Sequence, residues 1–441
     1  MKRRTNTRRT PPADSSDERG SLTTLALLSL LAGAASGLVG ACFRRALEQA
    51  DHLRNELITW AYGYSLLGLV LVVAIAAAAT ALAAWLVRRF APDATGSGIP
   101  HVEAVLRGEK SAAPFLLLPV KFVGGLLAIG AGLALGREGP TVQMGASVAH
   151  FVGRVFRRNA ADARILLAAG AGAGLATAFN APIAGSVFVL EELMRRFDTR
   201  ITIATLGASA AAIGVSRILL GEAPDFALDQ LPYPALGSMP IYLVLGLLVG
   251  LLGIAYNRAI LASLAVAARM SRVSVELRAA VVGAAVGLLA WCAPDLVGGG
   301  DPITERALHG NAMFTLLPAV FAVRFALGAV SYAAGTPGGL FAPLLVLGAQ
   351  AGLFYGTFAC QWLPAAGTNP TAYAVTGMAA FFTAVVRAPV TGIILVIELT
   401  SSDTQLLSML AACFTAMLIP TLTGNRPIYD SLGERSASEK E

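Results

Sequence analysis

The chain has 441 residues, of which 56% are hydrophobic and only 14% are charged. Soluble domains carry about 25% charged residues, and a water-soluble protein with so apolar a surface would aggregate. The composition therefore excludes a soluble globular protein and indicates an integral membrane protein. The net charge of +6 does not indicate nucleic-acid binding, because much of it lies in one polar segment before the first apolar run, at Lys2, Arg3, Arg4, Arg8 and Arg9.

The first two apolar segments are long enough to cross a bilayer. Leu22–Cys42 and Tyr64–Val87 contain no charged residue, and about 20 apolar residues suffice for one span. The basic tail, residues 1–20, is expected to be cytoplasmic under the positive-inside rule. Ala32-Gly33-Ala34 resembles a signal-peptide cleavage site, but the run is too long for a signal peptide and continues to Arg44-Arg45, which favours a retained helix.

Further spans follow, and basic loops alternate with them as expected for a multi-pass protein with cytoplasmic termini. They are Pro114–Leu135, Thr141–Phe156, Ile165–Leu193, Ile201–Ser216 and Ile241–Tyr256. Ile165–Leu193 is too long for one helix and contains Asn180-Ala181-Pro182, so it is expected to form two. Broken helices are tolerated at membrane depth where the backbone is buried in protein or lines a cavity. This pattern is typical of a transporter or channel.

An internal repeat divides the chain into two halves. Gly136–Ala146 and Gly339–Ala349 both read G-x-x-x-P-x-x-x-x-G-A, at an offset of 339 − 136 = 203. Asn180–Gly185 similarly matches Arg387–Gly392, and a glutamate, Glu191 or Glu398, follows six residues after the last glycine of each. We therefore expect an all-α membrane domain over residues 21–432, with halves at about 21–220 and 240–432 and a cytoplasmic tail at 433–441. In repeats of this kind the substrate site lies between the halves, near the midplane.

Four stretches could hold an anion at helix N-termini, where free N–H groups and the helix dipole favour negative charge. Glycine lets a ligand approach the backbone and proline suits the first helical turn. Each stretch also has an ordinary interpretation: an N-cap serine, an acidic cap paired with Arg137, a glycine packing contact and an interfacial tyrosine. The stretches are Gly96-Ser97-Gly98-Ile99-Pro100, Gly136-Arg137-Glu138-Gly139-Pro140, Gly338-Gly339-Leu340-Phe341-Ala342-Pro343 and Arg426-Pro427-Ile428-Tyr429.

These motifs, in this order, resemble the CLC chloride channel and transporter family over roughly Leu22–Leu432. The resemblance implies two inverted-topology halves of tilted and broken helices, and a homodimer with one pore in each subunit. It implies that Glu138 is a gating glutamate, with Lys121 and Arg137 as supporting basic residues near it. The chloride-binding residues that it implies are Ser97, Gly139, Leu340, Phe341 and Tyr429.

A second acidic residue, on the inner side, would distinguish a chloride/proton exchanger from a passive channel. The resemblance implies that Glu192 is the internal proton glutamate, whereas Glu191 is expected to be a salt-bridged cap beside Arg195 and Arg196. His101 and Arg107 stand where some bacterial exchangers have acids, although Glu103 remains. The chain stops twelve residues after Tyr429, so the cytoplasmic CBS pair of eukaryotic relatives is not expected.

The favoured interpretation is a chloride/proton antiporter of the cell inner membrane or plasma membrane, with chloride, protons and lipid as its partners. A passive voltage- or pH-gated chloride channel stays open as an alternative, and so does a fluoride exporter, although Ser97 and Tyr429 favour chloride. A scaffold or intramembrane enzyme is the alternative from another class, but no G-x-S-x-G or H-E-x-x-H motif is present. None of the four cysteines forms a C-x-x-C pair, and neither a metal nor a cofactor is expected.

Overall fold

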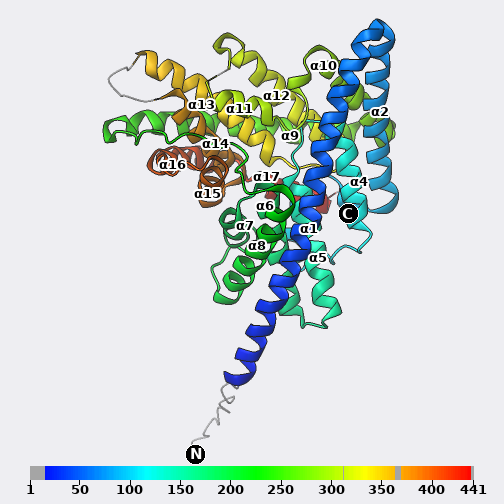
Figure 1. The fold of residues 1–441 in the computed structure, drawn as a ribbon, viewed down its shortest axis with the longest axis vertical. Coiled ribbons are helices and arrows are strands. Elements are labelled where there is room, and N and C mark those ends of the chain that lie inside the picture. The colour runs from blue at the N-terminus through cyan, green and yellow to red at the C-terminus, as the bar shows by residue number, and fades with distance from the viewer. Residues whose placement is uncertain (1–14, 311, 363–368, 439–441) are drawn as a thin grey trace, which may run out of the picture.

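The computed structural model describes residues 15–310, 312–362 and 369–438, and within these ranges the regular elements are helices (Figure 1). The helices are α1 (Ser15–Ala61), α2 (Ser65–Phe90), α3 (Ile99–Arg107), α4 (Leu117–Gly130), α5 (Glu138–Val155), α6 (Ala160–Phe179), α7 (Pro182–Phe188), α8 (Thr199–Leu220), α9 (Met239–Arg269), α10 (Val275–Cys292), α11 (Asp301–Leu308), α12 (Leu317–Tyr332), α13 (Phe341–Trp362), α14 (Pro370–Val386), α15 (Pro389–Thr400), α16 (Leu406–Leu422) and α17 (Ile428–Ser438). Short helical turns join some of them: η1 (Tyr62–Tyr64), η2 (Pro92–Ala94), η3 (Val189–Leu193), η4 (Leu236–Ser238), η5 (Pro294–Leu296) and η6 (Phe314–Leu316).

The fold is that of a multi-pass membrane protein. Six helical segments of the described chain are long and apolar enough to cross a bilayer: Ser21–Phe90, Thr199–Leu220, Leu236–Arg269, Val275–Cys292, Phe314–Tyr332 and Phe341–Trp362. Large apolar side chains are exposed along α2, α8 and α16, as in Leu67, Ile218 and Phe414, and a hydrocarbon environment accommodates them. The long α1, blue in Figure 1, runs beside α2 along one side of the molecule. It begins at Ser15, inside the expected tail, and continues to Ala61, well past the expected span.

The expected break after α6 is present. Asn180 adopts a left-handed conformation (φ 52°), and Pro182 starts α7 two residues later. The second half repeats this arrangement, because Arg387 ends α14 with φ 74° and Pro389 starts α15. Proline cannot continue a helix but fits the first turn of a new one. The same short sequence therefore breaks a helix in each half.

The two halves are inverted relative to each other, as α7 and α15 show. Glu191 lies just beyond α7, in η3, and accepts hydrogen bonds from the N-terminal amides of α15, whereas Glu398 near the end of α15 accepts bonds from the N-terminal amides of α7. Each repeated helix thus has its end beside the other's beginning, so the two run antiparallel. This confirms the expected inverted-topology, all-helical architecture.

A third pair of repeated segments was missed in the sequence. Residues 91–100 read A-P-D-A-T-G-S-G-I-P and residues 293–302 read A-P-D-L-V-G-G-G-D-P. Both form a short helical turn, η2 or η5, and then a left-handed glycine, Gly98 (φ 83°) or Gly300 (φ 97°), which precedes the next helix. The offset, 300 − 98 = 202, agrees with the other repeats.

Candidate anion and proton site

Three of the four predicted anion-binding stretches meet at the centre of the molecule through backbone hydrogen bonds. The Gly96 amide donates to Thr336 O at 3.0 Å, and the Gly338 amide donates to Gly96 O at 3.0 Å. Gly136 and Gly339 exchange two bonds, at 2.8 and 2.7 Å. The loop before α13 in the second half is therefore held between the loops before α3 and α5 in the first.

This pairing brings the N-termini of α3, α5 and α13 together. The first N–H groups of each helix have no acceptor within that helix, and the positive ends of the dipoles add to their attraction for an anion. Close approach depends on Gly139, because a Cβ there would lie 2.7 Å from Ser97 O and 2.9 Å from Ser97 Oγ. The arrangement is a buried pocket of backbone donors, built from both halves.

Glu138 places its own carboxylate in this pocket. The residue is 1% exposed, and its carboxylate interacts with its own amide and with that of Ala342 at the start of α13. Its Oε2 has no hydrogen-bond partner within the described chain. A Cβ on Gly136 would lie 1.9 Å from this oxygen, so glycine is required there for the carboxylate to adopt this position. The Glu138 carboxylate thus occupies a place that would suit a free anion.

Ser97 and Tyr429 lie on another side of the same centre. Both residues are buried, and the Tyr429 hydroxyl lies near Ser97 but has no hydrogen-bond partner of good geometry in the described chain. Ser97 Oγ accepts from the Ile99 amide at 3.2 Å. The Phe341 ring lies against Tyr429, with ring centroids 6.1 Å apart. A buried hydroxyl without a partner costs free energy, so the Tyr429 O–H group is available as a donor to an anion.

Tyr332, at the end of α12, belongs to this site and was not predicted. Its hydroxyl accepts from the Ser97 amide at 3.4 Å and would lie 3.0 Å from a Cβ on Gly96. It therefore supports the loop that carries Ser97. The available signal in the sequence was a lone tyrosine at the end of an apolar run, shortly before the Gly338-Gly339 motif.

The two predicted supporting cations have different partners. Lys121 Nζ donates to Ala94 O at 2.9 Å and to Gly96 O at 2.7 Å, so it fixes the Ser97 loop. Arg137 forms no ion pair with Glu138 in the described chain, which contradicts the interpretation of Glu138 as a cap paired with Arg137. Its guanidinium binds Asp225 instead, at 2.6 Å, because that carboxylate is brought over it by the segment between the halves.

Glu192 lies apart from the Glu138 pocket, at the edge of a cavity of about 370 Å³. The residue is 4% exposed and its Oε1 has no hydrogen-bond partner in the described chain, although the guanidinium of Arg195 lies 3.7 Å away. Glu103 is also buried and close enough to interact with Glu192 electrostatically. The cavity is lined by Leu190, Glu191, Glu192, Arg195, Phe197, Arg387, Pro427 and Asp430.

Glu191 is a helix cap, as expected, but its partners differ from those expected. Its carboxylate accepts bonds from the Val390 amide at 3.0 Å and from the amide and hydroxyl of Thr391, both at 2.7 Å. It caps α15 and, in the described part of the chain, forms no ion pair with Arg195 or Arg196, because the repeat brings the start of α15 directly opposite. Of the two adjacent acids, Glu192 is the one with a buried oxygen that accepts no hydrogen bond in the described chain.

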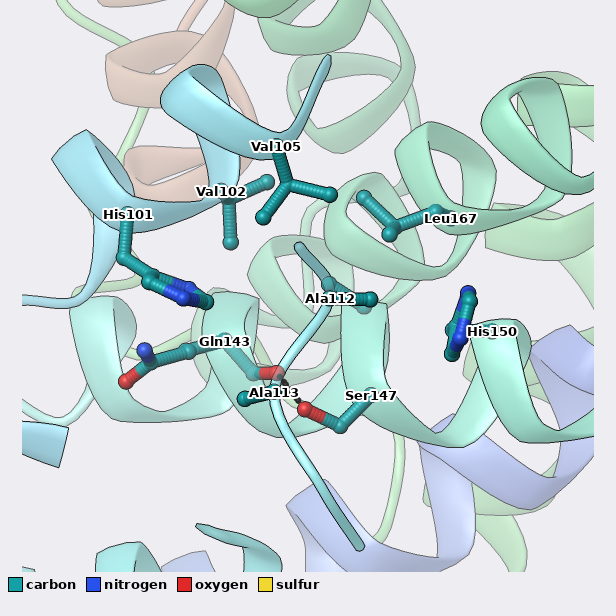
Figure 2. A pocket seen from close by; sticks show the side chains of 10 residues that line it. His101, Val102, Val105, Ala112, Ala113, Gln143, Ser147, His150 and Leu167 are labelled. Atoms are coloured by element: carbon teal, nitrogen blue, oxygen red, sulfur yellow. Dashed lines mark hydrogen bonds between the residues drawn. The ribbon is translucent and has the colours of Figure 1, made fainter. Parts of the chain in front are cut away.

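His101 faces a separate, much smaller cavity between α3, α5 and α6 (Figure 2). The cavity measures about 10 Å³, which is room for about one water molecule. Gln143, Ser147 and His150 line its other side, and Ser147 Oγ donates to Gln143 O at 2.9 Å. None of the lining residues is a predicted anion ligand, so His101 stands outside both the Glu138 pocket and the Glu192 cavity.

Comparison with known proteins defines the class of molecule to which this architecture belongs. Residues 79–421 match the voltage gated chloride channel (CLC) family, and the chain belongs to that family. It is 37% identical to an H(+)/Cl(−) exchange transporter, ClcA, from Vibrio cholerae over 415 residues, covering 93% of this chain and 89% of that protein.

Solved structures give the same fold. A slow cyanobacterial Cl−/H+ antiporter superposes with a TM-score of 0.90 at 33% identity, covering 94% of this chain and 98% of the other. A CLC-type fluoride/proton antiporter superposes with a TM-score of 0.76 at 24% identity, covering 90% and 95%, and that likeness concerns the fold alone.

Proposed function

We propose that this protein exchanges chloride for protons across the membrane, with Glu138 as its gate and Glu192 as its inner proton relay. The observation that carries the proposal is the position of the Glu138 carboxylate. It is buried at the start of α5 and interacts with the Ala342 amide at the start of α13, which supports the proposal that it takes the place of a chloride ion. The relatives named above are exchange transporters, which agrees with this proposal.

Competition at that place couples the two ions. The ionised carboxylate and a chloride ion compete for the same donors at the start of α13. Protonation removes the negative charge of Glu138 and with it the attraction for those donors, so the side chain yields to chloride. If proton binding favours chloride entry, chloride must favour proton binding equally, because linkage is reciprocal.

The remaining residues divide into a chloride path and a proton path. Ser97 and Tyr429 would hold the central chloride through their hydroxyl groups, with backbone amides of Gly139, Leu340 and Phe341 beside them. Glu192 would take protons from the inner cavity. Neither Ser97 nor Tyr429 is among the residues that line that cavity, which supports separate routes for the two ions from the inner side.

The assembly and orientation complete the proposal. We infer a homodimer with one pore per subunit in the cell inner membrane or plasma membrane, with both termini in the cytoplasm. The transmembrane domain spans residues 21–432 in two halves, at about 21–220 and 240–432. The Glu138 pocket then faces outward and the Glu192 cavity faces inward.

The alternatives differ in measurable ways. A passive chloride channel would move chloride without protons, and Glu192 would have no function in it. A fluoride exporter would not need the two hydroxyl donors that Ser97 and Tyr429 supply here. Purified protein in vesicles tests all three, because a chloride gradient should drive proton uptake while a fluoride gradient of the same size should drive much less. Chloride flux without proton movement would contradict the proposal.

A further inference from the structure

The segment between the two halves, residues 221–235, is bound to both of them. In the first half, Asn180 Nδ2 donates to Glu222 O at 3.1 Å. In the second, the Phe226 amide donates to Leu399 O at 3.0 Å. We call residues 221–235 the interhalf linker. Its path is thus fixed across the boundary between the halves, on the side where Arg137 lies.

Asp225 is the point at which this linker contacts the gate region. Its side chain is only 7% exposed and binds two arginines, Arg44 through Oδ1 and Arg137 through Oδ2, each at 2.6 Å. Arg137 Nε also donates to Ala178 O at 2.9 Å, and the Asp301 carboxylate lies 3.6 Å from its guanidinium. In the described chain, the hydrogen bond and the two ion pairs of the Arg137 side chain are all with groups other than Glu138.

The other charges near this cluster leave Asp225 as the main partner of Arg137. Arg44 also pairs with Glu48 at 3.2 Å, and Asp301 is half exposed and therefore well screened by solvent. Arg54 pairs with Asp51 at 2.5 Å. Of the carboxylates around Arg137, Asp225 makes the short and well-buried contact, and it holds the guanidinium together with the bond from Nε to Ala178 O.

Release of Arg137 would create a competitor for Glu138. Arg137 immediately precedes Glu138 in the chain, and the two side chains already interact electrostatically. Glu138 Oε2 is buried without a partner in the described chain, and a guanidinium with free N–H groups binds a carboxylate strongly in a water-poor site. An arginine paired with Glu138 would hold the carboxylate and slow its exchange with chloride.

We propose that Asp225 is a positioning residue that holds the guanidinium of Arg137 away from Glu138, so that the gate carboxylate stays free to exchange places with chloride. The inference deepens the proposed function and rests on it. If so, the interhalf linker, through Asp225, determines whether the Glu138 carboxylate is free to move.

Asp225→Asn in the reconstituted full-length protein tests this. We expect chloride-driven proton uptake to fall several-fold relative to wild type at neutral pH, and to recover toward wild type when both sides of the vesicle are made acidic. Acid restores it because a protonated Glu138 no longer binds the freed arginine. The matched control is Asp229→Asn, which removes the same charge from an exposed position of the same linker; it should behave as wild type at both pH values.

Two results would overturn the inference. One is an Asp225→Asn protein that matches Asp229→Asn, and the other is a loss of equal size at neutral and acidic pH, which a merely structural contact would give. In the Glu138→Gln background, Asp225→Asn should change chloride flux no further, because no carboxylate remains for Arg137 to bind.

A second variant serves if Asp225→Asn folds poorly. Arg44→Gln leaves Asp225 to Arg137 alone, so its proton uptake at neutral pH should equal or exceed that of wild type. A several-fold loss in Arg44→Gln, restored by acid, would contradict the inference. Different results would contradict the proposed function: a wild type that moves no protons, or proton coupling that survives Glu138→Gln.

Discussion

Lys121 and Arg324 bind equivalent backbone carbonyls in the two halves of the protein. Lys121 donates to Ala94 O and Gly96 O, and Arg324 donates to Leu296 O and Gly298 O, which lie 202 residues further along. Both cations are buried beneath the loop that precedes a short helix. In the first half that loop carries Ser97, and in the second Gly299 stands at the equivalent position, two residues before Asp301 starts α11.

Replacing either cation by methionine should destabilise the fold, Arg324→Met at least as much as Lys121→Met. Lys121→Met leaves two backbone carbonyls without their donor and Arg324→Met leaves three, because Arg324 also donates to Gly299 O, and an unsatisfied buried acceptor costs about 1–3 kcal/mol. Lys121→Met should also weaken chloride binding because its loop carries Ser97, whereas Arg324→Met should not. Thermal unfolding and chloride calorimetry in detergent measure the two effects, and weakened chloride binding in Arg324→Met alone would contradict this division.

Glu191 and Glu398 should matter for stability and little for transport. Each caps the helix start of the opposite half, and loss of an N-cap costs about 0.5–2 kcal/mol. Glu191→Gln and Glu398→Gln should therefore lower the unfolding temperature by similar amounts and keep most proton flux. Glu192→Gln should stop proton transport with chloride flux largely intact. If Glu191→Gln uncouples the ions and Glu192→Gln does not, the relay has been assigned to the wrong acid.

Removal of a single hydroxyl should weaken chloride binding without unfolding the protein. Ser97→Ala and Tyr429→Phe each delete one neutral donor, worth about 0.5–1.5 kcal/mol net, or roughly a 2- to 13-fold rise in Kd. Tyr332→Phe removes only an acceptor of the Ser97 amide, so its effect should be smaller. Isothermal titration with chloride compares the three. Unchanged affinity in both Ser97→Ala and Tyr429→Phe would place the ion elsewhere.

Gly136→Ala should displace the gate carboxylate while leaving its charge in the protein. The new methyl group would lie 1.9 Å from Glu138 Oε2, so the side chain must leave its present position. Proton coupling should fall as chloride flux persists. Gly214→Ala is the control, because a Cβ there meets no atom within 4 Å; coupling intact in both variants would show that the seated carboxylate is not needed.

Local sequence patterns predicted the helix starts, the break at Asn180-Ala181-Pro182 and most of the residues that meet at the centre. Glycine and proline determine the helix starts and breaks within their own short segments, and the internal repeat shows that these occur once in each half. Partners far apart in the chain were not predicted. Nothing near Glu191 reveals the start of α15, and nothing near Arg137 reveals Asp225, because inversion of the halves and the path of the interhalf linker create those contacts.

The repeated A-P-D segment, in contrast, was visible in the sequence. Ala91-Pro92-Asp93 and Ala293-Pro294-Asp295 stand 293 − 91 = 202 residues apart, close to the offsets of the other repeats. Because Lys121 and Arg324 lie nearly the same distance apart, this repeat makes them candidate equivalents on sequence alone. Tyr332 carried no such signal, because residue 129, which lies at a matching offset in the first half, is an isoleucine without a polar group.

The most direct test of the account is chloride-driven proton uptake into vesicles that contain either wild-type protein or Glu138→Gln. A neutral amide can neither carry the proton nor compete as an anion with chloride. With equal pH on both sides of the vesicle, the account predicts that a chloride gradient drives proton uptake by the wild type. In Glu138→Gln it predicts chloride flux without proton uptake. Proton uptake that persists in Glu138→Gln, or is absent from the wild type, would contradict it.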